Sequence, residues 1–407
     1  MAVNPFESSL GDRLAELRHR RGMTQEQLAE RADLSVDVVR KLEQGRRKTA
    51  RLSSINALAR ALDTEPSYLV GQPSTFETSS ETANGLPSVL ALRQAVSPVD
   101  ELLGGEPDPE DPPSIQDLQA ALRSTERIRR EGRMGEIGVL LPQLVRDARA
   151  AAHAYTGRDR AAAHSVLTVA YQVAATTLTA LGKEDAAFTA MERAMAAIQL
   201  SDDPNLETLS ASTLAWVFTK QGRLDDAERI ALARADQIEP GFRSDPEDLA
   251  LWGILLLRAA TAAARQERHG TVQDLLRRAK GAAHAMGRDL TIYATPFGPT
   301  NTGIAEVNFL VEMEKSPEAV RAARAVTNLG ALPATWRARF HVDRALAYTD
   351  LGKDRMAERA LLRAEEDAPE WMRYHSTTRR LIADLRERAP RRDALVLGLA
   401  DRLGLMK

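Results

Sequence analysis

Apolar side chains recur at every third or fourth position along most of the chain, which is the spacing of amphipathic α-helices. From residue 114 onward the pattern continues helix after helix. Strand-like alternation is nearly absent, and residues 290–294 are the one clear exception. The pattern therefore predicts an all-α protein.

Turn signals interrupt the helical pattern of residues 114–407. They lie 40, 48, 45 and 37 residues apart, at Gly182, Gly222, Gly270, Lys315-Ser316-Pro317 and Gly352. The copy at residues 340–369 combines alanines, an aromatic residue, a turn glycine and a closing proline, which is typical of a tetratricopeptide repeat. The usual period is about 34 residues, so we interpret the copies as degenerate tetratricopeptide-like (TPR-like) repeats. A stacked α-solenoid is favoured over a plain helical bundle.

Residues 9–71 carry closely spaced helix start and stop signals. Thr24 and Gln27 form a capping box, in which each side chain satisfies a free backbone N–H of the other residue. After a tight turn, Ser35 can cap the next helix. The predicted helices are residues 10–21, 24–32, 36–44, 52–62 and 66–70. Two short helices joined by a three- or four-residue turn form a helix-turn-helix unit, whose second helix enters the DNA major groove.

The third predicted helix has an apolar and a polar face. Val39 and Leu42 are three residues apart, so we expect them to face the core. The outer face is then left with Val36, Asp37, Arg40 and Lys41. Between Arg40 and Arg51 there are six basic residues and one acidic residue, Glu43. Such a patch supplies the salt-dependent attraction to phosphates.

A linker separates this segment from the repeats. Residues 73–117 hold one arginine and nine acidic residues, although the net charge of the chain is only −2. Prolines near both ends of this stretch oppose regular helix, and one short helix is expected between them. We predict three parts: a DNA-binding domain at 1–71, an acidic linker at 72–113 and a TPR-like domain at 114–407.

The N-terminal segment resembles the Cro/CI-type helix-turn-helix domain of the xenobiotic-response-element (XRE) family. The resemblance is carried by Thr24-Gln25-Glu26-Gln27-Leu28-Ala29 followed by Ser35, Val39, Leu42, Glu43 and Gly45. It implies a five-helix domain in which Arg18 and Glu43 tie the first helix to the third.

The resemblance also implies a role for each residue of the DNA-binding surface. Gln25 would hold a phosphate and brace the recognition helix, while Val36, Asp37, Arg40 and Lys41 would read bases. Asp37 could accept from cytosine N4 and Val36 could touch a thymine methyl group, or both could be idle. The full predicted set is Gln25, Ser35, Val36, Asp37, Arg40, Lys41, Arg46, Arg47, Lys48 and Arg51.

The order of the parts resembles peptide-pheromone-responsive regulators and actinobacterial XRE-type regulators with a TPR-like domain. In the former, asparagines on inner helices hold the peptide. The candidate residues for a peptide or small-molecule effector are Trp252, Arg258, Asn301 and Asn308. The alternative is structural: Asn301 or Thr302 caps a helix that follows a loop at 293–304, and Asn308 is a satisfied buried amide.

We therefore expect a transcriptional regulator that binds a double-stranded DNA operator as a homodimer, gated by an effector. In one alternative, DNA binding is constitutive and the solenoid is a platform for protein partners. In another, an enzyme such as a hydrolase carries a DNA-binding head.

Other classes of function have little support. The chain has no cysteine, which excludes disulfides, thiolate metal sites and cysteine nucleophiles. Its seven histidines are scattered, and no phosphate-binding Gly-rich motif is present. We expect no catalytic residue, no metal and no cofactor. No apolar run is long enough to span a membrane and no secretory signal is evident, so a cytoplasmic protein is expected.

Overall fold

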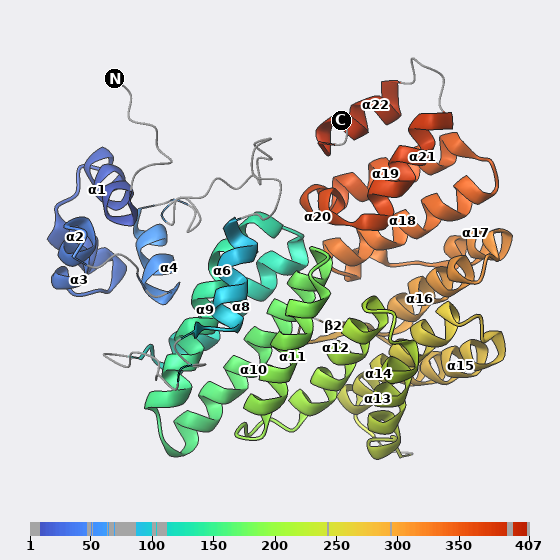
Figure 1. The fold of residues 1–407 in the computed structure, drawn as a ribbon, viewed down its shortest axis with the longest axis horizontal. Coiled ribbons are helices and arrows are strands. Elements are labelled where there is room, and N and C mark those ends of the chain that lie inside the picture. The colour runs from blue at the N-terminus through green and yellow to red at the C-terminus, as the bar shows by residue number, and fades with distance from the viewer. Residues whose placement is uncertain are drawn as a thin grey trace. The chain divides into compact units, whose positions relative to one another are not determined.

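The computed structural model shows a protein built almost entirely of helices (Figure 1). The structure describes residues 9–46, 50, 52–62, 64, 69, 87–99, 103, 112–241, 244–293, 295–388 and 394–404. Within these residues, β-structure is limited to one two-stranded sheet. The predicted class, an N-terminal helix-turn-helix domain with a TPR-like α-solenoid, is confirmed. Among the described helices, none is long and apolar enough to cross a membrane.

Two compact units divide the chain. Unit 1 consists of Met1–Thr125, Met134–Ala174 and Ala196–Asp202, and unit 2 of Glu126–Arg133, Ala175–Met195 and Asp203–Lys407. The elements up to the middle of the chain are α1 (Leu10–Arg20), α2 (Gln25–Ala32), α3 (Val36–Glu43), α4 (Leu52–Ala61), α6 (Pro87–Val96), α8 (Ile115–Glu131), α9 (Met134–Ala154), α10 (Gly157–Ala180) and α11 (Glu184–Ile198).

The remaining elements all belong to unit 2. They are α12 (Asn205–Lys220), α13 (Leu224–Gln237), α14 (Pro246–Arg265), α15 (His269–Met286), β1 (Leu290–Ile292), β2 (Thr295–Phe297), α16 (Pro299–Glu312), α17 (Ser316–Ala325), the 3₁₀ turn η1 (Leu329–Ala331), α18 (Ala334–Asp350), α19 (Asp354–Asp367), α20 (Pro369–Tyr374), α21 (Ser376–Arg388) and α22 (Ala394–Arg402).

In unit 1, helices α1 to α4 enclose their own apolar core. Leu14, Leu28, Leu42 and Leu58 are fully buried in it. Each comes from a different helix, so the core joins all four helices. Further along unit 1, the short helix α6 packs along α9 and buries one of its faces. Of the predicted fifth helix, only Leu69 is described, and it is buried in the same core as the four leucines.

In unit 2, consecutive helices pack as pairs. The pairs are α12 with α13, α14 with α15, α16 with α17 and α18 with α19, and the first helices of neighbouring pairs also touch (Figure 1). Alanines occupy many of the crossings; for example, Ala227, Ala231, Ala259 and Ala263 are fully buried. Small side chains let the helix axes approach closely, which is how each pair can stack on the next.

The turn inside a pair requires one residue in the left-handed backbone region. Gly222 between α12 and α13 and Gly352 between α18 and α19 fill this position with φ of 77° and 66°, and Gly182 between α10 and α11 has φ of 69°. Glycine adopts such angles without the steric cost of a Cβ atom. The turns predicted at these three glycines are therefore confirmed.

Two other turns differ from the prediction. Gly270 lies in the first turn of α15, and the left-handed residue before that helix is Glu267, with φ 55°. Before α17 the same role falls to Glu314, with φ 58°, while Ser316 already belongs to the helix. The turn predicted at Gly270 is therefore wrong, because the chain turns at Glu267 and Gly270 already lies inside α15.

A β-hairpin precedes α16. Leu290 pairs with Phe297 and Ile292 with Thr295, so the strand signal at 290–294 is confirmed for β1. The loop predicted for the following residues is wrong over Thr295–Phe297, because a sheet of two strands tolerates Pro296 at its edge. Phe297 is fully buried against α14, where a Cβ atom on Gly253 would overlap its ring.

The start of α16 is capped from outside the helix. Asp289 accepts hydrogen bonds from the Thr300 amide at 3.0 Å and from the Asn301 amide at 3.4 Å. The helix begins at Pro299, so Asn301 and Thr302 lie within its first turn. The expectation that Asn301 or Thr302 would cap this helix is therefore wrong, because a carboxylate eleven residues upstream of Thr300 satisfies the free amides.

Candidate nucleic-acid interface

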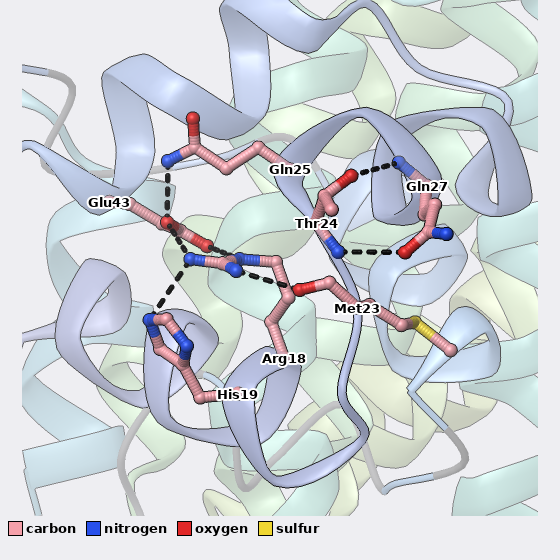
Figure 2. Close-up of polar contacts among 7 residues, drawn as sticks. All are labelled: Arg18, His19, Met23, Thr24, Gln25, Gln27 and Glu43. Atoms are coloured by element: carbon pink, nitrogen blue, oxygen red, sulfur yellow. Dashed lines mark hydrogen bonds and ion pairs between the residues drawn. The ribbon is translucent and has the colours of Figure 1, made fainter.

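The first three helices begin at side-chain caps. Thr24 Oγ1 accepts from the Gln27 amide at 3.2 Å, and Gln27 Oε1 accepts from the Thr24 amide at 2.9 Å (Figure 2). Ser35 Oγ accepts from the Val38 amide at 3.4 Å at the start of α3. Both predicted caps are confirmed. A third cap, which was not predicted, is the capping box that joins Ser9 and Asp12 at α1.

The turn between α2 and α3 is tight. Asp33 takes a left-handed conformation with φ 54°, and the Leu34 amide donates to the Ala29 carbonyl at 2.9 Å. Asp33 is a residue type that tolerates this conformation better than most. The turn therefore fixes the angle at which α3 leaves α2.

A close backbone approach locks α1 onto α3. A Cβ atom on Gly11 would overlap the carbonyl oxygen of Leu42, so only glycine fits at this position of α1. This contact could not be predicted from the sequence, because a glycine near a helix start has several common uses. The contact between Gly11 and Leu42 fixes the orientation of α3, so the exposed face of α3 also points in one direction.

Two polar side chains, those of Arg18 and Gln25, bind Glu43 and reinforce this arrangement (Figure 2). Arg18 donates from Nε to Glu43 Oε1 at 2.7 Å and from Nη2 to Oε2 at 2.9 Å. Its Nη1 donates to the Met23 carbonyl at 2.8 Å, and Gln25 Nε2 donates to Glu43 Oε2 at 2.7 Å. The pair thus ties α1 to α3, as the sequence resemblance implied, while Gln25 joins α2 to the same carboxylate.

The carboxyl group of Glu43 is held in its charged form. Burial acts to raise its pKa, but the hydrogen bonds from Arg18 and Gln25 outweigh burial and lower the pKa of Glu43 below its ordinary value. The side chains of Arg18 and Glu43 are only 9% and 6% exposed. A bidentate arginine–carboxylate pair fixes orientation as well as distance. The network therefore braces α3 from two neighbouring helices.

The other face of α3 carries charges. Asp37, Arg40 and Lys41 are exposed, while Val39 and Leu42 are fully buried. Lys41 Nζ lies 2.8 Å from an Asp37 carboxylate oxygen, so these two charges partly neutralise each other. Arg40 makes no ion pair with any carboxylate that the structure describes. It is therefore the charge on this face that is most available to a partner.

The remaining DNA-binding candidates divide into three groups. Val36 is half-buried and packs against the core, so only part of its side chain is accessible. Ser35 is exposed, and its hydroxyl serves as the cap of α3. Arg46 is exposed just beyond α3. The rest of the basic run, Arg47, Lys48 and Arg51, lies outside the described residues.

The four effector candidates lie on α14 and α16 in unit 2. Arg258 donates from Nε to Ser212 Oγ at 3.2 Å, and its guanidinium carbon lies 5.2 Å from the centre of the Trp216 ring. Asn308 donates from Nδ2 to Asp343 at 3.2 Å. Burial acts to raise the pKa of Asp343 above its usual value, against the ion pair with Arg339.

Trp252 and Asn301 are buried more deeply. Trp252 is 8% exposed, and the Arg278 guanidinium lies 5.1 Å from its ring centre. Trp252 Nε1 and Asn301 Nδ2 have no hydrogen-bond partner among the described residues. No described hydrogen bond or ion pair joins either residue to Arg258 or Asn308. The four candidates are therefore not joined by any described polar contact, and their role in binding an effector stays a prediction.

Comparison with known proteins gives one match at the sequence level. Residues 9–68 match the family described as "Helix-turn-helix domain". This segment is a helix-turn-helix DNA-binding domain. No curated protein sequence matches the chain.

Two solved structures align with most of the chain, but with low sequence identity and low TM-scores. PlcR of Bacillus thuringiensis, solved in complex with the peptide PapR7 and DNA, is 11% identical with a TM-score of 0.38, over 87% of this chain and 99% of PlcR. The TPR domain of P58(IPK) is 13% identical with a TM-score of 0.20, over 94% of this chain and 98% of that domain.

Sequence reasoning missed one group of residues in unit 2. Lys220 Nζ and the Arg258 guanidinium carbon lie 4.7 Å and 5.2 Å from the centre of the Trp216 ring, and no motif in the sequence indicated this group. A weak signal exists, since Lys220 is the last residue of a largely apolar helix. In the described part of the chain, no set of three or more acidic or histidine side chains is placed to hold a metal ion.

Proposed function

We propose that the protein is a transcriptional regulator that recognises a specific DNA operator through α3. The observation that carries the proposal is the orientation of α3. Its inner face is fixed by the Gly11 contact and by the Arg18–Glu43–Gln25 network, and its outer face presents Arg40 without an ion pair to any described carboxylate. A rigid helix with a basic, accessible face suits direct contact with base edges in the major groove.

The candidate residues have different roles in this proposal. Arg40 reads a base edge, with Val36, Asp37 and Lys41 beside it. Because Asp37 and Lys41 pair with each other, binding a base edge through either residue first requires that pair to open. The phosphate contacts come from Gln25, Ser35, Arg46, Arg47, Lys48 and Arg51.

Residues 1–71 act as the DNA-binding domain, residues 72–113 as a linker and residues 114–407 as the TPR-like domain. One helix-turn-helix module contacts few base pairs, so useful affinity requires two modules on half-sites about 34–36 Å apart. The TPR-like domain supplies the dimer contact and binds an effector. The effector acts by favouring one arrangement of the two DNA-binding domains over another.

The test is selection of bound sequences from fragmented genomic DNA, with and without an extract of the host cells. The proposal expects enriched sites with two half-sites about one helical turn apart, and a change in occupancy when extract is added. Enrichment that does not respond to extract, together with a protein partner that co-purifies, would favour a constitutive DNA-binding protein with an interaction platform. No enrichment over bulk DNA would refute the proposal.

A further inference from the structure

Two basic side chains on neighbouring helices of unit 2 share one tryptophan. Lys220 Nζ on α12 lies 4.7 Å from the centre of the Trp216 ring, and the Arg258 guanidinium carbon on α14 lies 5.2 Å from it. Helices α12 and α14 pack against each other, so this is a fixed arrangement of the fold. Lys220, Trp216 and Arg258 are all partly buried.

The cations nearby differ in how they are neutralised. Arg339 pairs with Asp343 at 3.1 Å, and Arg265 lies 3.6 Å from Glu312. Lys220 and Arg258 form no ion pair with a carboxylate in the described part of the chain. The side-chain hydrogen bond of Arg258 goes to the neutral hydroxyl of Ser212.

The surroundings make the two unpaired charges costly. Burial, the charge of Arg339 and the charge of Arg265 lower the pKa of Lys220 to about 8. Burial and Arg339 likewise lower the pKa of Arg258 to about 10. Glu312 and Glu184 act in the opposite direction on Lys220 but do not outweigh burial and the two arginines. A partly buried cation that forms no ion pair is less stable in its charged form than it is in water. An anion placed between the two side chains would remove this cost.

We propose that Lys220 and Arg258 bind the anionic group, a carboxylate or a phosphate, of a small ligand beside Trp216. This inference rests on the proposed effector-binding role and names the chemistry of that effector. The arginine offers a planar set of N–H donors and the lysine a point charge with three donors, which together can satisfy several oxygens of one anion. The Trp216 ring lies within 5.2 Å of both cations and positions each of them through a cation–π contact.

The site also predicts a dependence on pH. Lys220 is protonated in about nine tenths of the molecules at pH 7 and in about one tenth at pH 9, given its pKa of about 8. Affinity for the anion should therefore fall about tenfold between these pH values. The charged or titratable groups that act on Lys220, or on which it acts, are Arg265, Arg339, Glu312, Glu184 and His375. Of these, burial holds the pKa of His375 far below its usual value, so it stays neutral in this range.

The test measures binding of inorganic phosphate and of acetate to the full chain by calorimetry, with chloride at equal ionic strength as the baseline. The expected result is saturable binding of at least one of the two anions above that baseline. If only phosphate binds, the ligand group is a phosphate, and if only acetate binds, it is a carboxylate. Lys220→Met and Arg258→Met should each weaken binding about tenfold or more, since a hydrogen bond to a charged group is lost. Lys353→Met, which removes an exposed lysine, is the matched control and should change nothing.

A further variant separates charge from titration. Lys220→Arg keeps the cation but not the low pKa, so it should retain binding at pH 7 and lose the tenfold fall at pH 9. No anion binding by the wild type above chloride, or equal binding by Lys220→Met and Lys353→Met, would overturn the proposed site. The selection of operator DNA by the same protein is a separate measurement. If no anion binds, the operator proposal still stands, and if no operator is enriched, the anion-binding result is unaffected.

Discussion

The helix-turn-helix domain and the TPR-like helices differ in whether their buried or partly buried cations form ion pairs. In the first region Arg18 is matched by Glu43, Gln25 completes the network, and both members of the ion pair are almost fully buried. In the second, Lys220 and Arg258 are partly buried over the Trp216 ring and form no ion pair with any described carboxylate. A neutralised charge network holds a fold together, whereas unneutralised cations are available for a ligand. The comparison thus separates a scaffold from a candidate site.

The largest expected effect comes from breaking the scaffold. Glu43→Gln leaves the buried Arg18 without its counter-charge, which should cost about 3–5 kcal/mol, because the unpaired cation remains buried. Hydrogen exchange of α1 and α3 measures the loss as faster local opening. Glu16→Gln, which removes an exposed pair with Arg20, should cost less than about 1 kcal/mol. Equal effects of the two variants would show that the Arg18–Glu43 pair is not structural.

Acid should affect the TPR-like helices through a buried histidine. Burial and Arg344 lower the pKa of His341 to about 4, against the opposing effect of Asp367. The unfolded chain, with a pKa near 6.5, then binds more protons than the folded chain between about pH 6.5 and 4. Stability is therefore full above about pH 6.5 and decreases as the pH falls toward 4. His341→Gln should flatten this dependence in urea titrations followed by tryptophan fluorescence; an unchanged slope would exclude His341 as its source.

A smaller gain is expected at a turn of the TPR-like helices. Glu267 holds a left-handed conformation that costs an L-residue about 1 kcal/mol and costs glycine little. Glu267→Gly should therefore stabilise unit 2 by up to about 1 kcal/mol in the same urea titration. Gly270→Ala inside α15 is the control, and it should also be neutral or stabilising, since nothing lies within 4 Å of a Cβ there. A loss of stability in Glu267→Gly would mean that the glutamate side chain is needed.

The smallest effect should come from the unneutralised cations. Arg258→Met removes a guanidinium that pairs with no described carboxylate, so we expect a change in unfolding free energy within about 1 kcal/mol. Arg18→Met in the helix-turn-helix domain should destabilise far more, because Glu43 would be left buried and alone. If both substitutions proved equally damaging, the distinction between scaffold and site would fail.

Local signals in the sequence were enough to predict the helix-turn-helix domain. The Thr24–Gln27 box, the Ser35 cap and the Val39–Leu42 spacing act within one or two helical turns, and all appear in the structure. The Gly11 contact with α3 was not predictable in this way, because it depends on how two helices cross.

In the TPR-like helices, glycine marked only some of the turns. Gly222 and Gly352 were identified because glycine favours the backbone angle of the turn, while Glu267 and Glu314 adopt that angle without a sequence signal. The cation pair was also invisible in the sequence. Arg258 reaches Ser212 and Trp216 across 46 and 42 positions of the chain, so only the packing of α12 on α14 brings them together.

The most direct test of the account compares Arg40→Ala with Arg46→Ala on DNA. Fluorescence anisotropy at one salt concentration would measure the affinity of each for a selected operator and for random duplex. We predict that Arg40→Ala loses about 1–3 kcal/mol on the operator and relaxes the preference at one base pair, while Arg46→Ala weakens both duplexes equally. Equal losses on operator and random DNA for Arg40→Ala would contradict base recognition by α3.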